Sequence, residues 1–321
     1  MKFITPPRLS IGDEIRIIAP SDSLVRVGGM MANISSKKKL ESWGYKVSFG
    51  DHVLENDIRD SSSIKSRVED IHAAFADKNV KAIVSVIGGA TSNELLPYLD
   101  FNLIKENPKI IVGFSDFTAL ANAITSKTGL ITYYGPAYAT LKMNGELGKY
   151  QDTYWQKVLK NEHVTLTSSQ YWESYNWFDP DASPNLKSNA WKVYTPGIAE
   201  GVTVGGNLNT FYLLQGTPFQ PNLDGNILLT EFSDGSDWYE YSRNLASLLQ
   251  IANNPKGLLI GRFPPDTGMT EEKLLYVLEL FPILKKIPVI YNVNFGHTQP
   301  IFTIPIGKKV TIDSTKKTIS Y

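Results

Sequence analysis

The stretch Lys109-Ile110-Ile111-Val112-Gly113-Phe114-Ser115-Asp116-Phe117-Thr118-Ala119-Leu120 predicts a strand, a tight turn and a helix. The apolar run stops at the turn, and apolar residues then recur at helical spacing. A serine in such a turn has an exposed hydroxyl beside the free N–H groups of the helix start. Ser115 is therefore a candidate nucleophile. Alternatively, Ser115 and Asp116 only cap the helix, because Ser and Asp are preferred at that position.

The first half of the chain alternates short apolar runs with segments of helical spacing. Strands are predicted at 13–21, 45–50 and 81–87, and helices at 35–43, 62–77 and 93–98. This alternation predicts a doubly wound parallel sheet of the Rossmann or flavodoxin type, with helices on both faces. Ligands bind beyond the carboxyl ends of the strands in such sheets. Since Gly88-Gly89 and Ser115 follow consecutive strands, we expect them to lie close together.

The chain changes character after about residue 145. A helix is predicted at 150–162, and residues 168–191 form a long segment rich in polar residues and proline that contains Trp172, Trp177 and Trp191. Loops of this length in compact proteins are usually binding loops or linkers. The three tryptophans either contact a ligand or pack at a domain junction.

The remaining segments predict a second α/β domain with more strand. Strands are predicted at 197–206, 226–231, 257–261 and 288–293, helices at 241–252 and 271–280, and short strands within 302–320. We therefore expect an N-terminal domain at 1–165 and a C-terminal domain at 166–321.

Composition excludes several classes of function. The chain has 321 residues, of which 32 are Lys or Arg and 32 are Asp or Glu, so it lacks the basic field that gathers nucleic acid or anionic lipid. It has no cysteine, which excludes disulfides, thiolate metal sites and a cysteine nucleophile. No apolar run approaches the ~20 residues of a membrane helix, and the N-terminus lacks the apolar segment of a signal peptide. We expect a cytoplasmic protein.

The rare titratable residues supply partners for Ser115. Among the four histidines, His297 lies in a Gly- and Pro-restricted turn just after a predicted strand, whereas His72 and His163 have the surroundings of surface residues and His52 is ambiguous. Glu231 ends the apolar strand 227–230; its alternative role is a solvated charge at a strand end. Together Ser115, His297 and Glu231 have the chemistry of a nucleophile, a base and an orienting acid, each at a strand end.

Several motifs, taken together, resemble the LD-carboxypeptidase family of serine peptidases (family S66), in the branch typified by microcin C7 self-immunity. The matching segments are Pro7–Gly12, Ile17–Ser21, Gly88-Gly89 with Ser92–Asp100, Pro108-Lys109 with Gly113–Asp116, Tyr134–Pro136, Gly205–Leu208, Gly216–Pro218, Ile227–Glu231 and Gly296-His297.

The resemblance implies roles for particular residues. It implies Ser115 as nucleophile, His297 as general base and Glu231 as the acid that orients it. Its oxyanion hole would consist of the backbone N–H groups of Asp116 and of the Gly88-Gly89 turn. The family fold pairs the first domain with a strand-rich, swivelling-type second domain and places the active site between them. The resemblance also implies a homodimer, and it calls for no metal or cofactor.

The branch implies the substrate. Immunity-type members cleave the amide that joins an aminoacyl or peptidyl group to a nucleotide-like moiety, and the segment 168–191 resembles their insertion. We expect Trp172 or Trp177 to stack on a purine, and Asn207, in the matching segment Gly205–Leu208, to contact substrate. Classical members instead release D-alanine from a murein tetrapeptide, which is the alternative function.

Two rival classes and a metal hydrolase fit less well. An α/β-hydrolase needs Gly-x-Ser-x-Gly, and Phe117 occupies the last position. A noncatalytic small-molecule-binding protein could have two α/β domains and an aromatic cleft, but it would not need the Ser, Glu and His. A metal hydrolase is disfavoured because the histidines lack ligand spacing.

Overall fold

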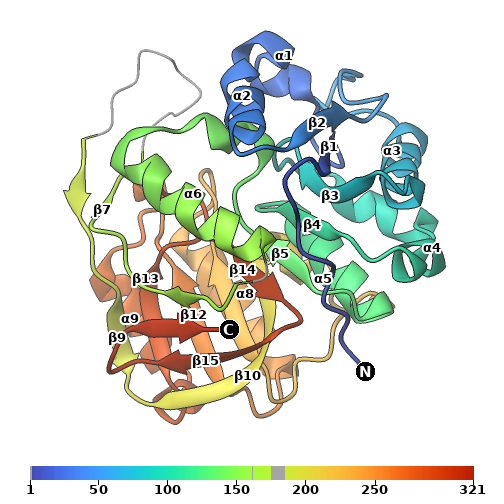
Figure 1. Cartoon of the computed structure of the whole chain (residues 1–321). Coiled ribbons are helices and arrows are strands. Elements are labelled where there is room, and N and C mark those ends of the chain that lie inside the picture. The colour runs from blue at the N-terminus through green and yellow to red at the C-terminus, as the bar shows by residue number, and fades with distance from the viewer. Residues whose placement is uncertain (1, 161, 175–184) are drawn as a thin grey trace.

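Two sheets with their own helices lie side by side in the protein (Figure 1). The computed structural model describes residues 2–160, 162–174 and 185–321. The chain runs from the first sheet, at the upper right of Figure 1, to the second sheet, at the lower left. This two-domain α/β architecture, with a parallel first sheet and a strand-rich second one, confirms the predicted fold class.

The first sheet has the strand order β14-β5-β4-β3-β1-β2, and β2, β1, β3, β4 and β5 are parallel. Its strands are β1 (Glu14–Ile18), β2 (Lys46–Phe49), β3 (Val80–Ser85), β4 (Ile110–Gly113), β5 (Thr132–Tyr134) and β14 (Ile304–Ile306). Every residue of β4 and five of the six in β3 are buried. These central strands read as continuous apolar runs because helices cover both faces of a parallel sheet.

The helices of the first half fill the connections between these strands. They are α1 (Gly29–Ala32), α2 (Ile34–Ser42), α3 (Ile64–Ala76), α4 (Phe101–Glu106), α5 (Phe117–Thr128) and α6 (Gly145–Leu159). Short 3-10 helices occur at Leu24–Val27, Ser92–Tyr98 and Tyr138–Lys142.

Helix α5 lies between the two halves of the molecule. Ten of its twelve residues are buried, which explains why its sequence is apolar and small on every side. The Asn122 amide exchanges two hydrogen bonds with the Gly205 backbone of the second sheet, with lengths of 2.9 and 3.1 Å. Thr118 Oγ1 accepts a hydrogen bond from Asn207 N at 2.9 Å. The helix that follows Ser115 is thereby fixed to both domains.

The second sheet has the order β6-β16-β15-β10-β11-β12-β13-β9. Its strands are β6 (Thr165–Leu166), β9 (Lys192–Thr195), β10 (Ile198–Asn207), β11 (Ile227–Glu231), β12 (Gly257–Gly261), β13 (Val289–Val293), β15 (Lys309–Asp313) and β16 (Thr318–Ser320). Strands β10 to β13 are parallel, and the others pair antiparallel. The carboxyl ends of β10 to β13 therefore meet at one edge of the sheet.

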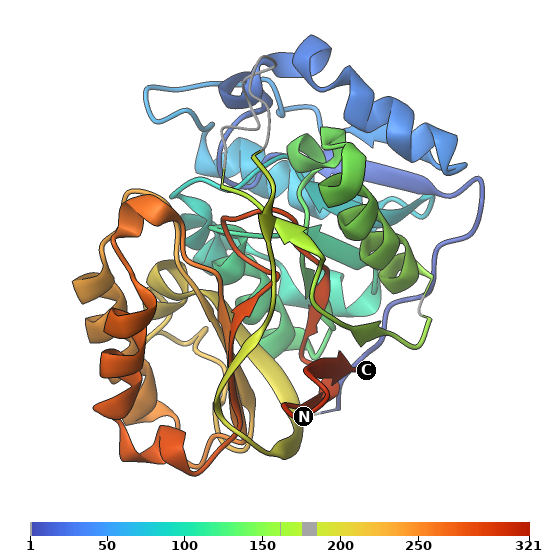
Figure 2. The same ribbon diagram turned by 90° about the vertical axis from the view of Figure 1, so that its left-hand side faces the viewer.

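Helices α7 (Leu208–Tyr212), α8 (Trp238–Ile251) and α9 (Glu271–Glu279) join these parallel strands. Helices in the orange part of the chain cover one side of the sheet, as Figure 2 shows. Further 3-10 helices occur at Pro265–Thr267 and Pro282–Lys285. No helix in the described ranges is both long enough and apolar enough to cross a membrane.

Near its end the chain returns to the first sheet. Strand β14 pairs antiparallel with β5, with Ile304 opposite Tyr134 and Ile306 opposite Thr132. The chain then goes back to the second sheet through β15 and β16 (Figure 1). A division of the chain near residue 165 remains a proposal, and β14 belongs in space to the sheet on the other side of it.

The tryptophan-rich segment is not a plain loop where the structure describes it. Strands β7 (Tyr171–Trp172) and β8 (Lys187–Ser188) pair antiparallel as a two-stranded ribbon. Trp191 is fully buried, and its Nε1 donates a hydrogen bond to Asn294 Oδ1 at 2.8 Å. Packing is therefore the role of Trp191. Trp177 lies outside the described residues.

Candidate functional site

Ser115 lies in a strained turn between β4 and α5, as the sequence predicts. Its φ is 60°, in the left-handed region that non-glycine residues rarely adopt. A serine held in this way at a strand-to-helix turn resembles a nucleophile elbow, in which strain exposes the hydroxyl. Gly88 makes the turn possible, because a Cβ at that position would lie 2.7 Å from Ser115 Cβ.

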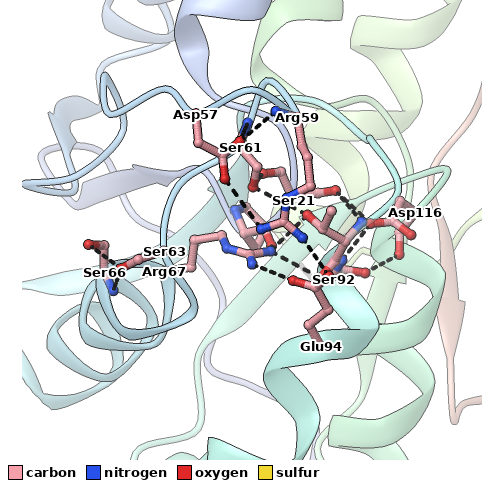
Figure 3. A network of polar contacts seen from close by, with 12 residues as sticks. Ser21, Asp57, Arg59, Ser61, Ser63, Ser66, Arg67, Ser92, Glu94 and Asp116 are labelled. Carbon is pink, nitrogen blue, oxygen red and sulfur yellow. Dashed lines mark hydrogen bonds and ion pairs between the residues drawn. The ribbon is translucent and has the colours of Figure 1, made fainter.

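The Ser115 and Asp116 side chains do not cap α5. The Asp116 backbone is at the N-cap position, but its side chain makes no capping hydrogen bond. Asp116 Oδ2 instead accepts hydrogen bonds from Ser21 Oγ at 2.6 Å and from Ser92 N at 2.8 Å. Figure 3 shows this contact joining the turn after β4 to the segment after β3. The cap interpretation is therefore wrong for these side chains.

A buried arginine also holds the segment after β3 in place. Arg67 of α3 is 1% exposed and donates to Pro20 O, Thr91 O and Thr91 Oγ1. Its Nη2 lies 2.8 Å from Glu94 Oε2 (Figure 3). The loops that follow β1 and β3 are thus held together by one guanidinium.

His297 joins Ser115 to Glu231 across the two domains. His297 Nε2 lies 2.9 Å from Ser115 Oγ, and His297 Nδ1 lies 2.7 Å from Glu231 Oε2. Ser115 follows β4 in the first sheet, whereas Glu231 ends β11 and His297 follows β13 in the second. The structure thus brings together the three residues that the sequence singled out, in the order nucleophile, base and acid.

Two glycines let the Glu231 carboxylate approach His297. A Cβ at Gly296 would lie 2.6 Å from Glu231 Oε2, and one at Gly261 would lie 2.7 Å from Glu231 Cβ. Glu231 itself is fully buried. A carboxylate buried this deeply requires hydrogen-bond partners, and His297 supplies one of them.

The second partner of Glu231 is Tyr134 at the end of β5. The Tyr134 hydroxyl donates to Glu231 Oε1 at 2.6 Å and accepts a hydrogen bond from Ser115 N at 3.0 Å. Burial, followed by the charge of Glu231, raises the pKa of Tyr134 well above its ordinary value, so the hydroxyl keeps its proton. The sequence motif Tyr134–Pro136 contributes to the family resemblance, but it gave no indication of this role.

Glu231 also governs the charge of His297. Burial lowers the pKa of His297, but the charge of Glu231, its hydrogen bond and the nearby Asp234 and Asp266 outweigh burial and raise the pKa above its ordinary value. The imidazolium form is therefore stabilised, as a base that accepts a proton from a serine requires.

Three backbone N–H groups lie near Ser115 without an internal acceptor. Within the described residues, the N–H groups of Gly88, Gly89 and Asp116 donate no hydrogen bond. The ideal Cβ position at Gly88 is 2.9 Å from Ser115 Oγ and 3.5 Å from Asp116 N. These amides are thus placed around the Ser115 hydroxyl, where a developing oxyanion would need donors.

Two cavities meet at Ser115 and Gly89. The smaller has a volume of about 150 Å³ and is lined in part by Asp22, Arg26, Asp234, His297 and Gln299. The larger, of about 450 Å³, is lined in part by Asn207, Asn209, Arg243 and Asn244. Asn207 is 2% exposed, and its Nδ2 has no hydrogen-bond partner in the part of the chain that the structure describes. Asn207 is therefore placed beside Ser115 with a free donor.

Trp172 lines neither of these cavities. It borders a separate cavity of about 420 Å³, and its ring contacts Lys187 Nζ at 5.0 Å and Arg262 Cζ at 4.6 Å. Burial lowers the pKa of Arg262 to about 10. Because two cations already contact the ring, a purine would have to compete with them. Stacking of a base on Trp172 stays a prediction.

The other predicted histidine environments differ in detail. His72 is half-buried, and its Nε2 accepts a hydrogen bond from Asp100 N at 2.9 Å, so it is a structural residue and not simply a solvated one. His52 pairs with Glu55 at 2.8 Å. The described residues contain no cluster of three or more His, Asp or Glu side chains arranged to hold a metal ion.

Comparison with known proteins agrees with this architecture. Residues 15–135 match the model of the LD-carboxypeptidase N-terminal domain, and residues 200–312 match that of the C-terminal domain. The chain belongs to the LD-carboxypeptidase family. It is 40% identical to YocD of Bacillus subtilis (strain 168) over 314 residues, which cover 97% of this chain and 96% of YocD.

Relatives named for two different activities within this family are similar to the chain. The microcin C7 self-immunity protein MccF of Escherichia coli is 32% identical over 332 residues, with 97% of this chain and 94% of MccF covered. A probable murein peptide carboxypeptidase of Bacillus subtilis (strain 168) is 30% identical over 325 residues, with coverages of 98% and 92%.

Solved structures of the family superpose closely. An MccF-like protein from Bacillus anthracis str. Ames has a TM-score of 0.95 at 40% identity, covering 99% of this chain and 98% of that one. MccF in complex with aspartyl sulfamoyl adenosine has a TM-score of 0.89 at 30% identity, with the same coverages.

Proposed function

We propose that this member of the family is a serine-type amidohydrolase that cleaves the amide of an aminoacyl- or peptidyl-nucleotide conjugate. The observation that carries the proposal is the hydrogen-bonded chain from Ser115 Oγ through His297 to Glu231, 2.9 and 2.7 Å long, which spans the two domains. The nucleotide preference is supported by the similarity to MccF, which binds aspartyl sulfamoyl adenosine.

The first half of the reaction forms an acyl-enzyme. His297 Nε2 takes the proton of Ser115 as Ser115 Oγ attacks the carbonyl carbon. The negative charge on the carbonyl oxygen is stabilised by the N–H groups of Asp116 and of the Gly88-Gly89 turn, where one such donor is worth ~3 kcal/mol of barrier. The carbon–nitrogen bond then breaks, and the imidazolium gives its proton to the leaving nitrogen.

The second half regenerates the enzyme. Water attacks the ester carbonyl and loses a proton to His297, which returns it to Ser115 Oγ as the acid product leaves. Glu231 holds the imidazole orientation throughout and stabilises its charged form. Tyr134 fixes the position of Glu231 relative to the Ser115 backbone, since its hydroxyl makes a hydrogen bond to each.

The second candidate function is release of D-alanine from a murein tetrapeptide. Arg243 and the free Asn207 Nδ2 line the larger cavity at Ser115, where they are suited to bind a terminal carboxylate. The similarity to the murein peptide carboxypeptidase supports the same alternative. A cytoplasmic location and a homodimer remain predictions from the sequence.

The test is amide cleavage followed by mass spectrometry. Wild-type protein is incubated separately with an aspartyl-sulfamoyl adenosine and with a murein L,D-tetrapeptide. We expect cleavage of the nucleotide conjugate, and loss of at least about a thousandfold in kcat for Ser115→Ala with an unchanged circular dichroism spectrum. Release of D-alanine alone would establish the second candidate.

A folded Ser115→Ala variant with full activity would refute the serine mechanism. A wild-type protein that binds either compound without cleaving it, and that forms no adduct at Ser115 with a serine-directed reagent, would be a binding protein instead.

A further inference from the structure

The smaller cavity at Ser115 is lined by two carboxylates in addition to the Gly88-Gly89 turn. Asp22 and Asp234 both border it, and the Asp22 carboxylate accepts no hydrogen bond from any described residue. Asp22 Oδ1 lies close to Gly89, since a Cβ at that glycine would be only 2.2 Å away. Two carboxylates thus face a volume of about 150 Å³ beside the candidate nucleophile.

Two buried side chains next to this cavity each have one oxygen without a donor. Gln299 lines the cavity and is 3% exposed, and Glu173 is 4% exposed. Their backbones exchange hydrogen bonds of 2.8 and 2.9 Å, which makes their side chains neighbours. Gln299 Oε1 and Glu173 Oε2 have no hydrogen-bond partner among the described residues. Buried acceptors without donors are costly, so they indicate a ligand that donates.

The cations nearby are each engaged by a carboxylate. Arg26 borders the cavity, but its Nε lies 3.4 Å from Asp60. Lys187 lies 3.3 Å from the other oxygen of Glu173. Burial raises the pKa of Asp22 to about 7, while the charge of Arg26 lowers it only in part. Within the described lining, the two carboxylates therefore share one arginine, which also pairs with Asp60.

We propose that this cavity binds the α-ammonium group of the acyl residue in the substrate, an inference that rests on the proposed function. An ammonium group has three donors and a positive charge, which match Asp22, Asp234 and Gln299. Its α-carbon is bonded directly to the carbonyl carbon that Ser115 attacks, so the group must lie within a few ångströms of Ser115. A volume of about 150 Å³ holds a small amino-bearing group, and the larger cavity is left for the leaving group.

The test uses reagents that label Ser115 and resemble only the acyl side. Diphenyl 1-aminoethylphosphonate carries a free α-amine, and its N-acetyl derivative does not. In each, a Ser115 Oγ–phosphorus bond forms, one phosphorus–phenoxide bond breaks, and phenol leaves with the serine proton. Labelling is followed by intact-protein mass spectrometry. We expect the free amine to label wild-type protein about tenfold faster than the acetylated reagent.

The advantage of the free amine should depend on the two carboxylates. It should disappear in the double variant Asp22→Asn and Asp234→Asn, and it should persist in Asp224→Asn, a carboxylate on an exposed loop that lines neither cavity. Comparing the ratio of the two rates between variants removes the intrinsic difference in reactivity between the reagents.

The other outcomes separate this inference from the proposed function. Equal labelling by both reagents in wild-type protein, or an unchanged ratio in the double variant, would overturn the ammonium site and leave the serine mechanism standing. Labelling of Ser115 by neither reagent would contradict both. Faster labelling by a lysine-like phosphonate with an acetylated α-amine would overturn the α-amino assignment in favour of a side-chain amine.

Discussion

At the scale of single residues, Tyr134 links the turn of the proposed nucleophile to the acid of the proposed triad. Its hydroxyl contacts Ser115 N and Glu231 Oε1, and it lies at the end of β5 with no exposure to solvent. It touches neither the attacking oxygen nor the imidazole, so it is a positioning residue. Its effect on the reaction should therefore pass through Glu231 and His297.

Tyr134→Phe should lower kcat about tenfold with little change in KM, because it removes one donor to the Glu231 carboxylate without opening a cavity. The readout that distinguishes positioning from packing is the pH profile of kcat/KM. With one hydrogen bond fewer, the Glu231 carboxylate interacts differently with His297, and the acid limb should move. An unchanged limb together with unchanged kcat would assign Tyr134 to packing alone.

The charge of His297 predicts a pH dependence. A general base must be neutral, and the net effect of Glu231 and its neighbours raises the pKa of His297. Activity should therefore fall as pH decreases, with a midpoint in kcat/KM above the ordinary histidine value of about 6.5. Removing the negative charge with Glu231→Gln should shift that midpoint to lower pH.

Burial raises the pKa of Asp22 to about 7 as well, so the ammonium site proposed above would add Asp22 to the acid limb. Asp22→Asn should therefore lower kcat/KM but keep the limb that comes from His297, since Asp22 makes no hydrogen bond to His297 or Ser115. A midpoint below 6.5 in the wild type, or a limb that disappears in Asp22→Asn, would show that another group controls the rate.

At the scale of elements, Arg67 joins α3 to the loops after β1 and β3. Arg67→Met should reduce the free energy of unfolding by about 3 kcal/mol, because the carbonyl groups of Pro20 and Thr91 lose a buried donor. Urea unfolding followed by circular dichroism measures the change. The same variant should lose activity, since the Gly88-Gly89 turn depends on these loops.

Arg59 is the matched control. It binds the other oxygen of Glu94 at 2.8 Å but is exposed. Surface ion pairs contribute little, so Arg59→Met should leave the unfolding midpoint unchanged. Equal effects of the two substitutions would show that the ion pair with Glu94, rather than the buried carbonyl contacts, is what matters.

Helices and strands were predictable where the spacing of apolar residues agrees with the residues that end an element, such as glycine. The run that ends at Ser115 reads as strand, turn and helix because an apolar run, a glycine and helical spacing follow in order. Ser115, Glu231 and His297 were singled out because each follows or ends a predicted strand, and the family resemblance supplied their proposed roles. The ribbon of β7 and β8 was missed, since each strand has two residues and no alternation to detect.

Other features depend on contacts that no local pattern contains. Tyr134 sits in an apolar run and looks like a core aromatic until Glu231 is placed opposite it. Arg67 looks like a surface position of an amphipathic helix. The cations on Trp172 come from residues 187 and 262, and the acceptors Glu173 and Gln299 meet only when their backbones form an isolated β-bridge.

At the scale of the whole molecule, the proposed catalytic geometry requires the two domains to keep one relative position. Asn122 helps to hold them together, since it is fully buried and makes two hydrogen bonds to Gly205. Asn122→Ala should reduce the free energy of unfolding by about 3 kcal/mol, because the Gly205 N–H and C=O groups lose their partners in a buried interface. Scanning calorimetry should show a lower melting temperature.

Ser126→Ala tests whether this effect is specific. Ser126 also lies on α5 and reaches across to Phe219 O, but at 3.2 Å and only partly buried. Its loss should be tolerated with a much smaller shift. If both variants melt with the wild type, the domain contact is held by apolar packing, and the Asn122 hydrogen bonds add nothing.

The return of β14 to the first sheet bears on how the protein is made. Residues 304–306 leave the ribosome long after β5, yet they complete the sheet edge next to it. The first sheet therefore stays one strand short while the residues between β5 and β14 are made, with β5 as an open edge to which other chains can add. The first sheet is thus incomplete until β14 has emerged, and Ser115 meets His297 only after most of the second domain has been made.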